Sequence, residues 1–229
     1  MDERQTLAVI ARLRGDFPQK FGIPRQSGLV EALTARIVFE PTFRSAEALR
    51  GLEGFSHIWL IWGFSEQKQA GWSPTVRPPR LGGNRRMGVF ATRSPFRPNP
   101  LGLSCVRLLG TEPDGSALRV AGADLMDGSP IYDIKPYLPY ADCRPEATGG
   151  FVETHARKTL AVEIDPALLA PLPPSKQEVL RDVLAQDPRP PYHEDSARVY
   201  GMTFAGLCVK FTVSEGRLTV ISTEEAARP

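Results

Sequence analysis

Glycine and proline divide the first 140 residues into short apolar runs. The short length of these runs restricts the possible folds more than any other feature of the chain. Proline supplies 22 of the 229 residues, about twice its usual share of ~5%. The runs are too short for typical helices and are rich in β-branched residues, as strands are. They cover residues 6–13, 35–40, 57–64, 87–92, 101–109 and 118–123.

Six strands with no long helix between them indicate an antiparallel sheet, and closing the sheet into a barrel removes its exposed edges. A doubly wound nucleotide-binding fold is disfavoured, because strands and helices do not alternate and no G-x-G-x-x-G motif follows a strand. The sequence therefore predicts a mainly β fold, with a single-sheeted β-barrel as the N-terminal domain.

The pattern of expected secondary structure changes after a polar stretch at residues 141–150. A strand at 159–164 is followed by a helix that Ser175 would cap with Glu178 three residues on. Proline at 188 requires the helix to end before Asp187. Three further strands are expected at 199–203, 208–213 and 217–221. We therefore predict two domains, a β-barrel over 1–145 and a small α+β domain over 151–229.

The distribution of charge points to a polyanionic partner. Residues 67–111 contain eight Lys and Arg and no Asp or Glu, although the whole chain carries a net charge of only +2. A folded surface with such a block attracts phosphates, and Arg predominates in it, which suits bidentate phosphate contacts. The alternative is a solvated loop region whose charges are balanced by acidic residues from elsewhere in the chain.

Several classes of protein are disfavoured by what the sequence lacks. The longest apolar run, at 58–64, is about a third of the ~20 residues that a membrane helix needs. The N-terminus has no secretory signal, and three widely spaced Cys form no metal-ligand pattern. We expect a cytoplasmic protein with no metal site and no membrane or DNA partner.

Three loop segments carry the candidate chemistry. Residues 71–102 form a stiff Pro- and Arg-rich stretch, which is typical of a preorganised binding loop, or of a loop that only wraps the mouth of a barrel. Residues 124–137 bring three Asp beside a Lys and a Tyr, although Asp127-Gly128 is also a simple turn signal. Residues 186–193 form a second rigid segment with basic and aromatic residues.

Long strings within these segments resemble the TrmO/TsaA-like family of tRNA methyltransferases. They are PRQSGLV from Pro24, RGLEGFSHIWLIWGF from Arg50, PTVRPPRLGGNRRMGVFATRSPFRPNPLGLS from Pro74, DLMDGSPIYDIKPYLPYAD from Asp124 and LAQDPRPPY from Leu184. The resemblance covers nearly the whole chain. It implies a single-sheeted β-barrel, a homodimer with S-adenosylmethionine bound near the subunit contact, and methylation of N6 of threonylcarbamoyladenosine at position 37 of threonine tRNA.

The resemblance also implies which residues meet the cofactor. Arg25 and Arg93 suit its carboxylate or adenosine edge, because charged donors make strong hydrogen bonds. Asp124 and Asp127 suit its ammonium and adenosine. Ser65 and Glu66 stand where other members of the family have His-Gln. The expected cofactor-binding residues are Arg25, Gln26, Ser27, Ser65, Glu66, Arg93, Leu103, Asp124, Leu125, Met126 and Asp127.

The acceptor nitrogen is urea-like and a poor nucleophile until its proton is partly removed. We therefore expect Asp133, Lys135 and Tyr137 to form the catalytic group. Asp133 would steer or accept the proton, Lys135 would hold the threonyl carboxylate or stabilise negative charge, and Tyr137 would stack on or orient the base. The anticodon-arm phosphates are expected on Arg77, Arg80, Arg85, Arg86 and Arg189. Two alternatives stay open: a methyltransferase with a small acceptor, and a non-catalytic RNA-binding barrel.

Overall fold

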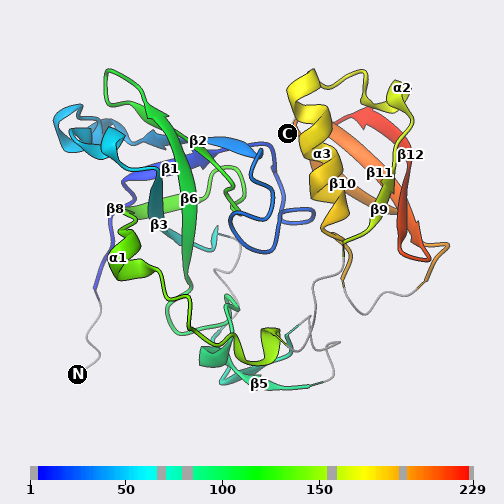
Figure 1. Cartoon of the computed structure of the whole chain (residues 1–229), viewed down its shortest axis with the longest axis horizontal. Coiled ribbons are helices and arrows are strands. Elements are labelled where there is room, and N and C mark those ends of the chain that lie inside the picture. Colours follow the sequence, from blue (N-terminus) through cyan, green and yellow to red (C-terminus); the bar gives the residue numbers. More distant parts are fainter. Residues whose placement is uncertain (1–4, 66–70, 79–84, 154–158, 191–194, 227–229) are drawn as a thin grey trace.

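The structure is a computed structural model that describes residues 5–65, 71–78, 85–153, 159–190 and 195–226. Figure 1 shows a barrel beside a smaller lobe in which a helix covers a sheet, with long loops extending from one end of the barrel. Among the described residues no helix is long and apolar enough to cross a membrane. No group of three or more His, Cys, Asp or Glu in the same described ranges is suited to a metal ion.

Six antiparallel strands close the barrel in the order β1-β2-β7-β6-β3-β8. Alternate residues point inward and fill the interior with apolar side chains such as Leu13, Ile37, Leu60 and Ile131, all at most 1% exposed. The strands are β1 (Ala11–Arg14), β2 (Thr34–Phe39), β3 (His57–Gly63), β6 (Leu101–Thr111), β7 (Ala117–Ala121) and β8 (Pro130–Pro136).

The predicted closed barrel is confirmed, but one of its strands was wrongly assigned. Residues 87–92 form only β5 (Met87–Gly88) and a short 3-10 turn, and β5 pairs with β4 (Thr75–Val76) outside the barrel. The sixth barrel strand is β8, which is not among the predicted strands. A proline stands at each end of β8. Because proline is depleted from strands and is tolerated mainly at their ends, the two prolines made this segment look unlike a strand in the sequence.

The C-terminal lobe is a four-stranded sheet in the order β10-β11-β12-β9. Its strands are β9 (Ala161–Glu163), β10 (Tyr200–Phe204), β11 (Leu207–Ser214) and β12 (Arg217–Glu225), with helices α2 (Pro166–Leu169) and α3 (Pro174–Ala185). Helix α3 buries Val179, Leu180, Val183 and Leu184, as its spacing predicts. The remaining short helices are η1 (Pro41–Phe43), η2 (Glu47–Leu49), η3 (Leu52–Gly54), η6 (Val89–Ala91), α1 (Pro139–Asp142) and η7 (Gly150–Val152).

The predicted capping box on α3 is wrong, whereas the predicted end of the helix is confirmed. The N-cap is Pro173 and no side chain caps the helix, so Ser175 lies inside the first turn. Two successive prolines preset the helical entry, and Pro174 at the first helical position lacks only an N–H that would have no partner within the helix. Asp187, with a left-handed φ of 50°, follows the end of α3.

Three apolar residues from the barrel half pack in the core of the C-terminal lobe. Phe17, Val30 and Leu33 are at most 3% exposed and join the cluster that contains Phe204 and Leu180. The Phe17 and Phe204 rings meet edge to face at 5.4 Å. The predicted division at 145–151 stays a prediction, and the packing shows that the barrel half completes the core of the lobe.

Candidate functional site

A cavity of about 1600 Å³ opens where the rim of the barrel meets the loops around residues 71–96 and 186–190. Ligand pockets are concave and carry a few convergent polar groups on mainly apolar walls. Among the described residues that line it, this cavity combines the carboxylate of Asp124 with several arginines and several aromatic rings. The polar and aromatic side chains that line it include Arg25, Gln26, Trp62, Phe64, Ser65, Arg77, Arg86, Phe90, Arg93, Phe96, Asp124, Phe151 and Arg189.

The carboxylate of the cavity is Asp124, which a buried hydrogen-bond chain holds in place. The Ser104 hydroxyl donates to Asp124 Oδ1 at 2.6 Å, and the Trp62 indole N–H donates to Ser104 Oγ at 2.9 Å. Ser104 is 1% exposed and Trp62 is 7% exposed. Asp124 follows β7, Ser104 lies in the neighbouring β6 and Trp62 in β3, so the pairing of these three strands brings the side chains together.

Burial raises the pKa of Asp124 above its usual value, while several contacts oppose the rise. The opposing contacts are the Ser104 hydroxyl, backbone N–H groups that include that of Ser27, and the positive charge of Arg93. A nearby cation stabilises the charged form of a partly buried carboxylate and offsets the cost of its burial. The site is therefore suited to an ammonium or sulfonium group.

Arginines also line the cavity and are held by neighbouring groups. Arg93 Nη1 donates to the Gln26 side-chain oxygen. Arg25 Nη2 donates to the backbone carbonyl of Arg189 at 2.8 Å. Asp187 binds Arg189 through both carboxylate oxygens, at 2.8 and 2.9 Å, and this hydrogen bonding raises the pKa of the Arg189 guanidinium. A segment before β2 and the loop after α3 thus meet at the cavity.

Aromatic rings give the cavity flat apolar surfaces on which a base can stack. The Trp62 and Phe64 ring centroids are 4.4 Å apart. Phe90 is 75% exposed and Phe96 is 39% exposed, although both line the cavity. Exposed rings beside arginines are typical of proteins that bind unpaired bases.

The predicted site residues did not include Ser104, Trp62, Phe64, Phe90 or Phe96. The alternation of β3, in which Ile58, Leu60 and Trp62 share the inward face, was the available signal for Trp62. No local pattern marks Ser104, because its partner Asp124 is twenty residues away.

Six of the predicted cofactor residues line the cavity together: Arg25, Gln26, Ser65, Arg93, Asp124 and Met126. Ser27 joins them through its backbone, which hydrogen-bonds Asp124. Glu66 lies outside the described residues.

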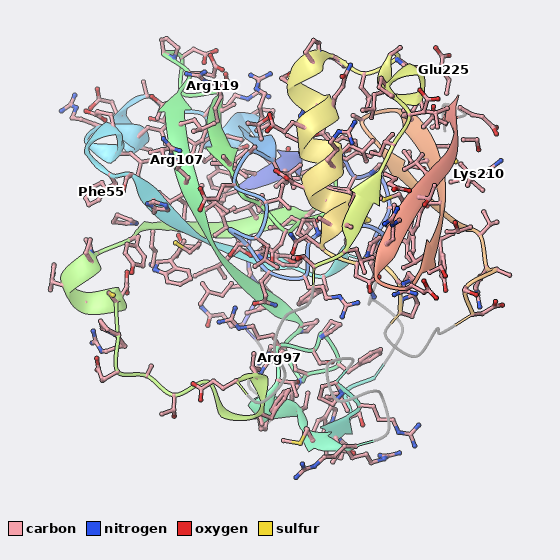
Figure 2. All side chains as sticks on the ribbon, turned by 45° about the vertical axis from the view of Figure 1, so that its right-hand side comes forward. Phe55, Arg97, Arg107, Arg119, Lys210 and Glu225 are labelled. Carbon is pink, nitrogen blue, oxygen red and sulfur yellow. The ribbon has the colours of Figure 1, made fainter. Side chains whose placement is uncertain are left out.

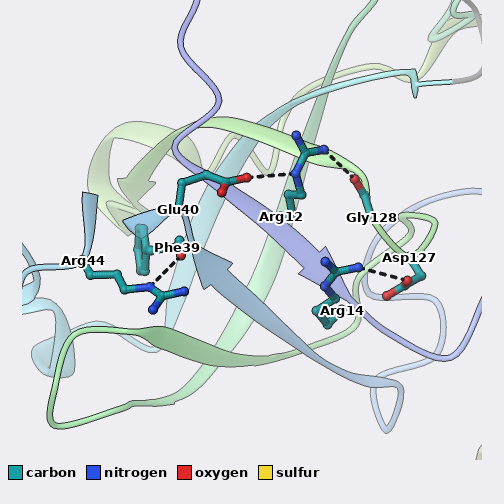
Figure 3. A network of polar contacts seen from close by, with 7 residues as sticks. All are labelled: Arg12, Arg14, Phe39, Glu40, Arg44, Asp127 and Gly128. Atoms are coloured by element: carbon teal, nitrogen blue, oxygen red, sulfur yellow. Dashed lines mark hydrogen bonds and ion pairs between the residues drawn. The ribbon is translucent and has the colours of Figure 1, made fainter. Parts of the chain in front are cut away.

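Three predicted cofactor residues lie elsewhere in the molecule. Leu125 is 3% exposed in the barrel core, because its side chain points inward. Asp127 closes a turn instead: its carboxylate accepts from the Gly15 N–H at 3.0 Å and meets Arg14 Nη1 at 3.4 Å (Figure 3). Leu103 is 57% exposed on the outer face of β6.

The predicted catalytic group does not line the cavity of the single chain. Asp133 and Lys135 lie on the outside of β8 and form an ion pair at 2.9 Å. Tyr137 packs against Trp59, with ring centroids 5.9 Å apart, and burial raises the pKa of its hydroxyl. Asp133 is in register with Ile61, which in turn faces Leu103, so the group and Leu103 share one outer face.

The predicted tRNA-binding arginines are partly gathered at the cavity. Arg77, Arg86 and Arg189 line it, and Arg86 Nη1 donates to Thr75 Oγ1 at 2.8 Å. Arg85 is exposed beside it in the sequence but not part of the lining. Arg80 lies outside the described residues.

The chain is similar to known proteins over nearly its whole length, and these proteins are described in the same way. The family profile of the tRNA-methyltransferase O N-terminal domain matches residues 12–143, and that of the TrmO C-terminal domain matches residues 157–226. The tRNA (adenine(37)-N6)-methyltransferase of Escherichia coli is 40% identical over 225 residues, covering 94% of this chain and 96% of the relative.

Two further matches agree with these. The tRNA (adenine(37)-N6)-methyltransferase of Eikenella corrodens is 48% identical over 163 residues, covering 71% of this chain and 93% of the relative. The crystal structure of TrmO from Pseudomonas aeruginosa superposes with a TM-score of 0.77 at 33% identity, covering 97% of this chain and 100% of that one.

Proposed function

This chain belongs to the tRNA-methyltransferase O (TrmO) family, and from that membership we propose that it transfers a methyl group from S-adenosylmethionine to N6 of adenine 37 in tRNA. The observation that carries the proposal is the joint presence of Asp124, the arginines and the aromatic rings on one cavity. We further propose that the acceptor is threonylcarbamoyladenosine of threonine tRNA, and that the enzyme works in the cytoplasm as a homodimer.

The donor set of the cavity fits S-adenosylmethionine, which supplies an electrophilic methyl group on a sulfonium when bound. Asp124 would hold its ammonium, because the carboxylate is oriented by Ser104 and lies in the cavity wall. Arg25 and Arg93 would bind its carboxylate or the edge of its adenosine. Methyl transfer is an in-line displacement, so these residues would act chiefly by orienting the donor toward the acceptor nitrogen.

Proton handling is assigned to Asp133, Lys135 and Tyr137. Since the three residues lie on the outer face of β8, away from the cavity, their part in the chemistry requires a second copy of the chain to bring that face to the cavity. The exposed apolar side chains Leu101 and Leu103 on β6, which lies beyond β3 on the same outer face, support such a contact, because an apolar face favours burial against a partner.

Labelled methyl transfer tests the function directly. The substrates are threonine tRNA with and without its threonylcarbamoyl group. Transfer to the modified tRNA alone is expected. A protein that binds S-adenosylmethionine but methylates neither tRNA would instead favour a small acceptor, and one that does not bind it would favour an RNA-binding barrel.

Mixing two inactive variants tests whether the site is shared between subunits. Asp124→Asn and Lys135→Ala are each expected to abolish turnover. If the site is shared, random re-pairing gives half heterodimers with one intact site each, and thus about a quarter of the wild-type rate. No recovered activity would contradict a shared site, and undiminished turnover of Lys135→Ala and Tyr137→Ala at saturating tRNA would remove the catalytic group.

A further inference from the structure

Three arginines lie directly opposite one another across three neighbouring barrel strands. Arg14 of β1 is in register with Arg36 of β2, and Arg36 is in register with Arg119 of β7. All three side chains are exposed on the outer wall of the barrel. Like charges in directly opposed cross-strand positions destabilise a sheet. This arginine ladder therefore gains from a negative charge supplied from outside the sheet.

The arginine ladder faces a second cavity, of about 470 Å³, between the barrel and the C-terminal lobe. Lys176, in the first turn of α3, completes the basic lining. Gly110 of β6 leaves room for the last arginine, since a Cβ there would come within 2.8 Å of Arg119 Nη2. Figure 2 shows Arg119 on the wall of the barrel, at the end opposite the loops that carry Arg97.

Carboxylates balance this cavity only in part. Asp16 belongs to the lining and pairs with Lys176 at 2.5 Å. Asp127 and Glu112 stand outside the lining and meet Arg14 and Arg36 at 3.4 and 3.6 Å.

The fourth cation is Arg119, whose guanidinium has no hydrogen-bond or ion-pair partner among the residues that the structure describes. Its guanidinium, together with the exposed faces of Arg14 and Arg36, leaves donors directed to solvent. The guanidinium group of arginine can donate two hydrogen bonds to the oxygens of one phosphate. The positive end of the α3 helix dipole also attracts an anion.

We propose that the arginine ladder and Lys176 form a second phosphate-binding site, which holds backbone phosphates of the RNA substrate. The inference rests on the proposed function for the identity of the RNA. No residue is shared between this lining and that of the larger cavity. The site would thus anchor a part of the RNA distant from the nucleotide that is methylated, and it would connect both lobes to one substrate.

RNA affinity at several salt concentrations tests the proposal. We would measure Kd for threonine tRNA with Arg36→Gln, Arg119→Gln and the double variant. Each lost phosphate contact lowers the slope of log Kd against log salt by about 1, and we expect roughly tenfold weaker binding of the double variant at low salt. Arg50→Gln is the control, because it removes the same charge from a residue with a 75% exposed side chain that lines neither cavity.

Thermal unfolding of the wild type and the ladder variants, with and without inorganic pyrophosphate, tests whether the site binds a small phosphate compound as well as RNA. Loss of RNA affinity confined to the ladder variants supports the RNA site. Unchanged RNA affinity, together with loss of pyrophosphate stabilisation, supports phosphate chemistry but overturns the RNA assignment. Neither effect, or an equal loss of affinity in Arg50→Gln, overturns the site.

Two measurements keep this test separate from other failures. Arg119→Gln should unfold at or above the wild-type temperature without ligand, since it relieves like-charge repulsion, whereas Arg36→Gln also loses its contact with Glu112. Thermal unfolding of each variant without ligand shows whether weak binding reflects misfolding. Methyl transfer is measured independently. A wild-type protein that binds tRNA without methylating it would therefore refute the proposed reaction and leave the phosphate site standing.

Discussion

At the scale of single residues, Ser104 joins the barrel core to the candidate cofactor site. Its hydroxyl accepts from Trp62 and donates to Asp124, and it is almost fully buried. Ser104→Ala leaves a buried indole N–H unsatisfied, which costs about 1–3 kcal/mol of unfolding free energy. Affinity for S-adenosylmethionine should fall roughly tenfold, because Asp124 loses its orienting donor. Calorimetric titration measures this, with Ser104→Thr as the control that keeps the hydroxyl; full affinity of the alanine variant would refute the role.

The raised pKa of Asp124 gives cofactor binding a pH dependence of definite sign. Attraction to an ammonium requires the carboxylate, so it is present above the pKa of Asp124 and lost as the pH falls through it. Since burial raises that pKa, affinity should begin to fall at a pH above the ordinary Asp value of about 3.9. Titrations between pH 4 and 8 check this, and Asp124→Asn should bind weakly with no such slope. An equal slope in Asp124→Asn would assign the pH dependence to another group.

At the scale of elements, the approach of β6 to β3 depends on Gly102. Trp62 is opposite Gly102 in the register, and a Cβ at that position would come within 2.2 Å of the indole ring. Gly102→Ala should displace Trp62 and lower the unfolding free energy by about 1–3 kcal/mol. Urea unfolding and near-ultraviolet circular dichroism measure both effects. Gly88→Ala is the control, because a Cβ there meets nothing within 4 Å; an equal loss in both variants would show that the ring contact is not the cause.

At the scale of the whole molecule, the barrel half completes the core of the C-terminal lobe. Phe17 is 2% exposed and packs on Phe204. Phe17→Ala should cost about 3–5 kcal/mol of unfolding free energy, as large core truncations do. Denaturant unfolding measures the loss, and Phe90→Ala, at a ring that is 75% exposed, should cost far less. A small effect of Phe17→Ala would show that the lobe is stable without the barrel contact.

The sequence by itself determined the features that depend on local order. Short apolar runs divided by turn residues predicted the barrel, and helical spacing with a following proline predicted α3 and its end. Long matching strings indicated the family and predicted as cofactor-binding Asp124, Arg25 and Arg93, which line the cavity. Such signals lie within a few residues of one another, where side-chain period and turn chemistry act directly.

Only the tertiary structure decided which distant residues meet. Pairing of β7, β6 and β3 sets Trp62, Ser104 and Asp124 in one hydrogen-bond chain, while strand register turns Leu125 into the core and leaves Lys135 on the outside. Strand register aligns Arg14, Arg36 and Arg119, and packing between the lobes brings Lys176 to them. These contacts arise from pairing between segments far apart in the chain, and a one-residue change of register would have turned each side chain to the opposite face.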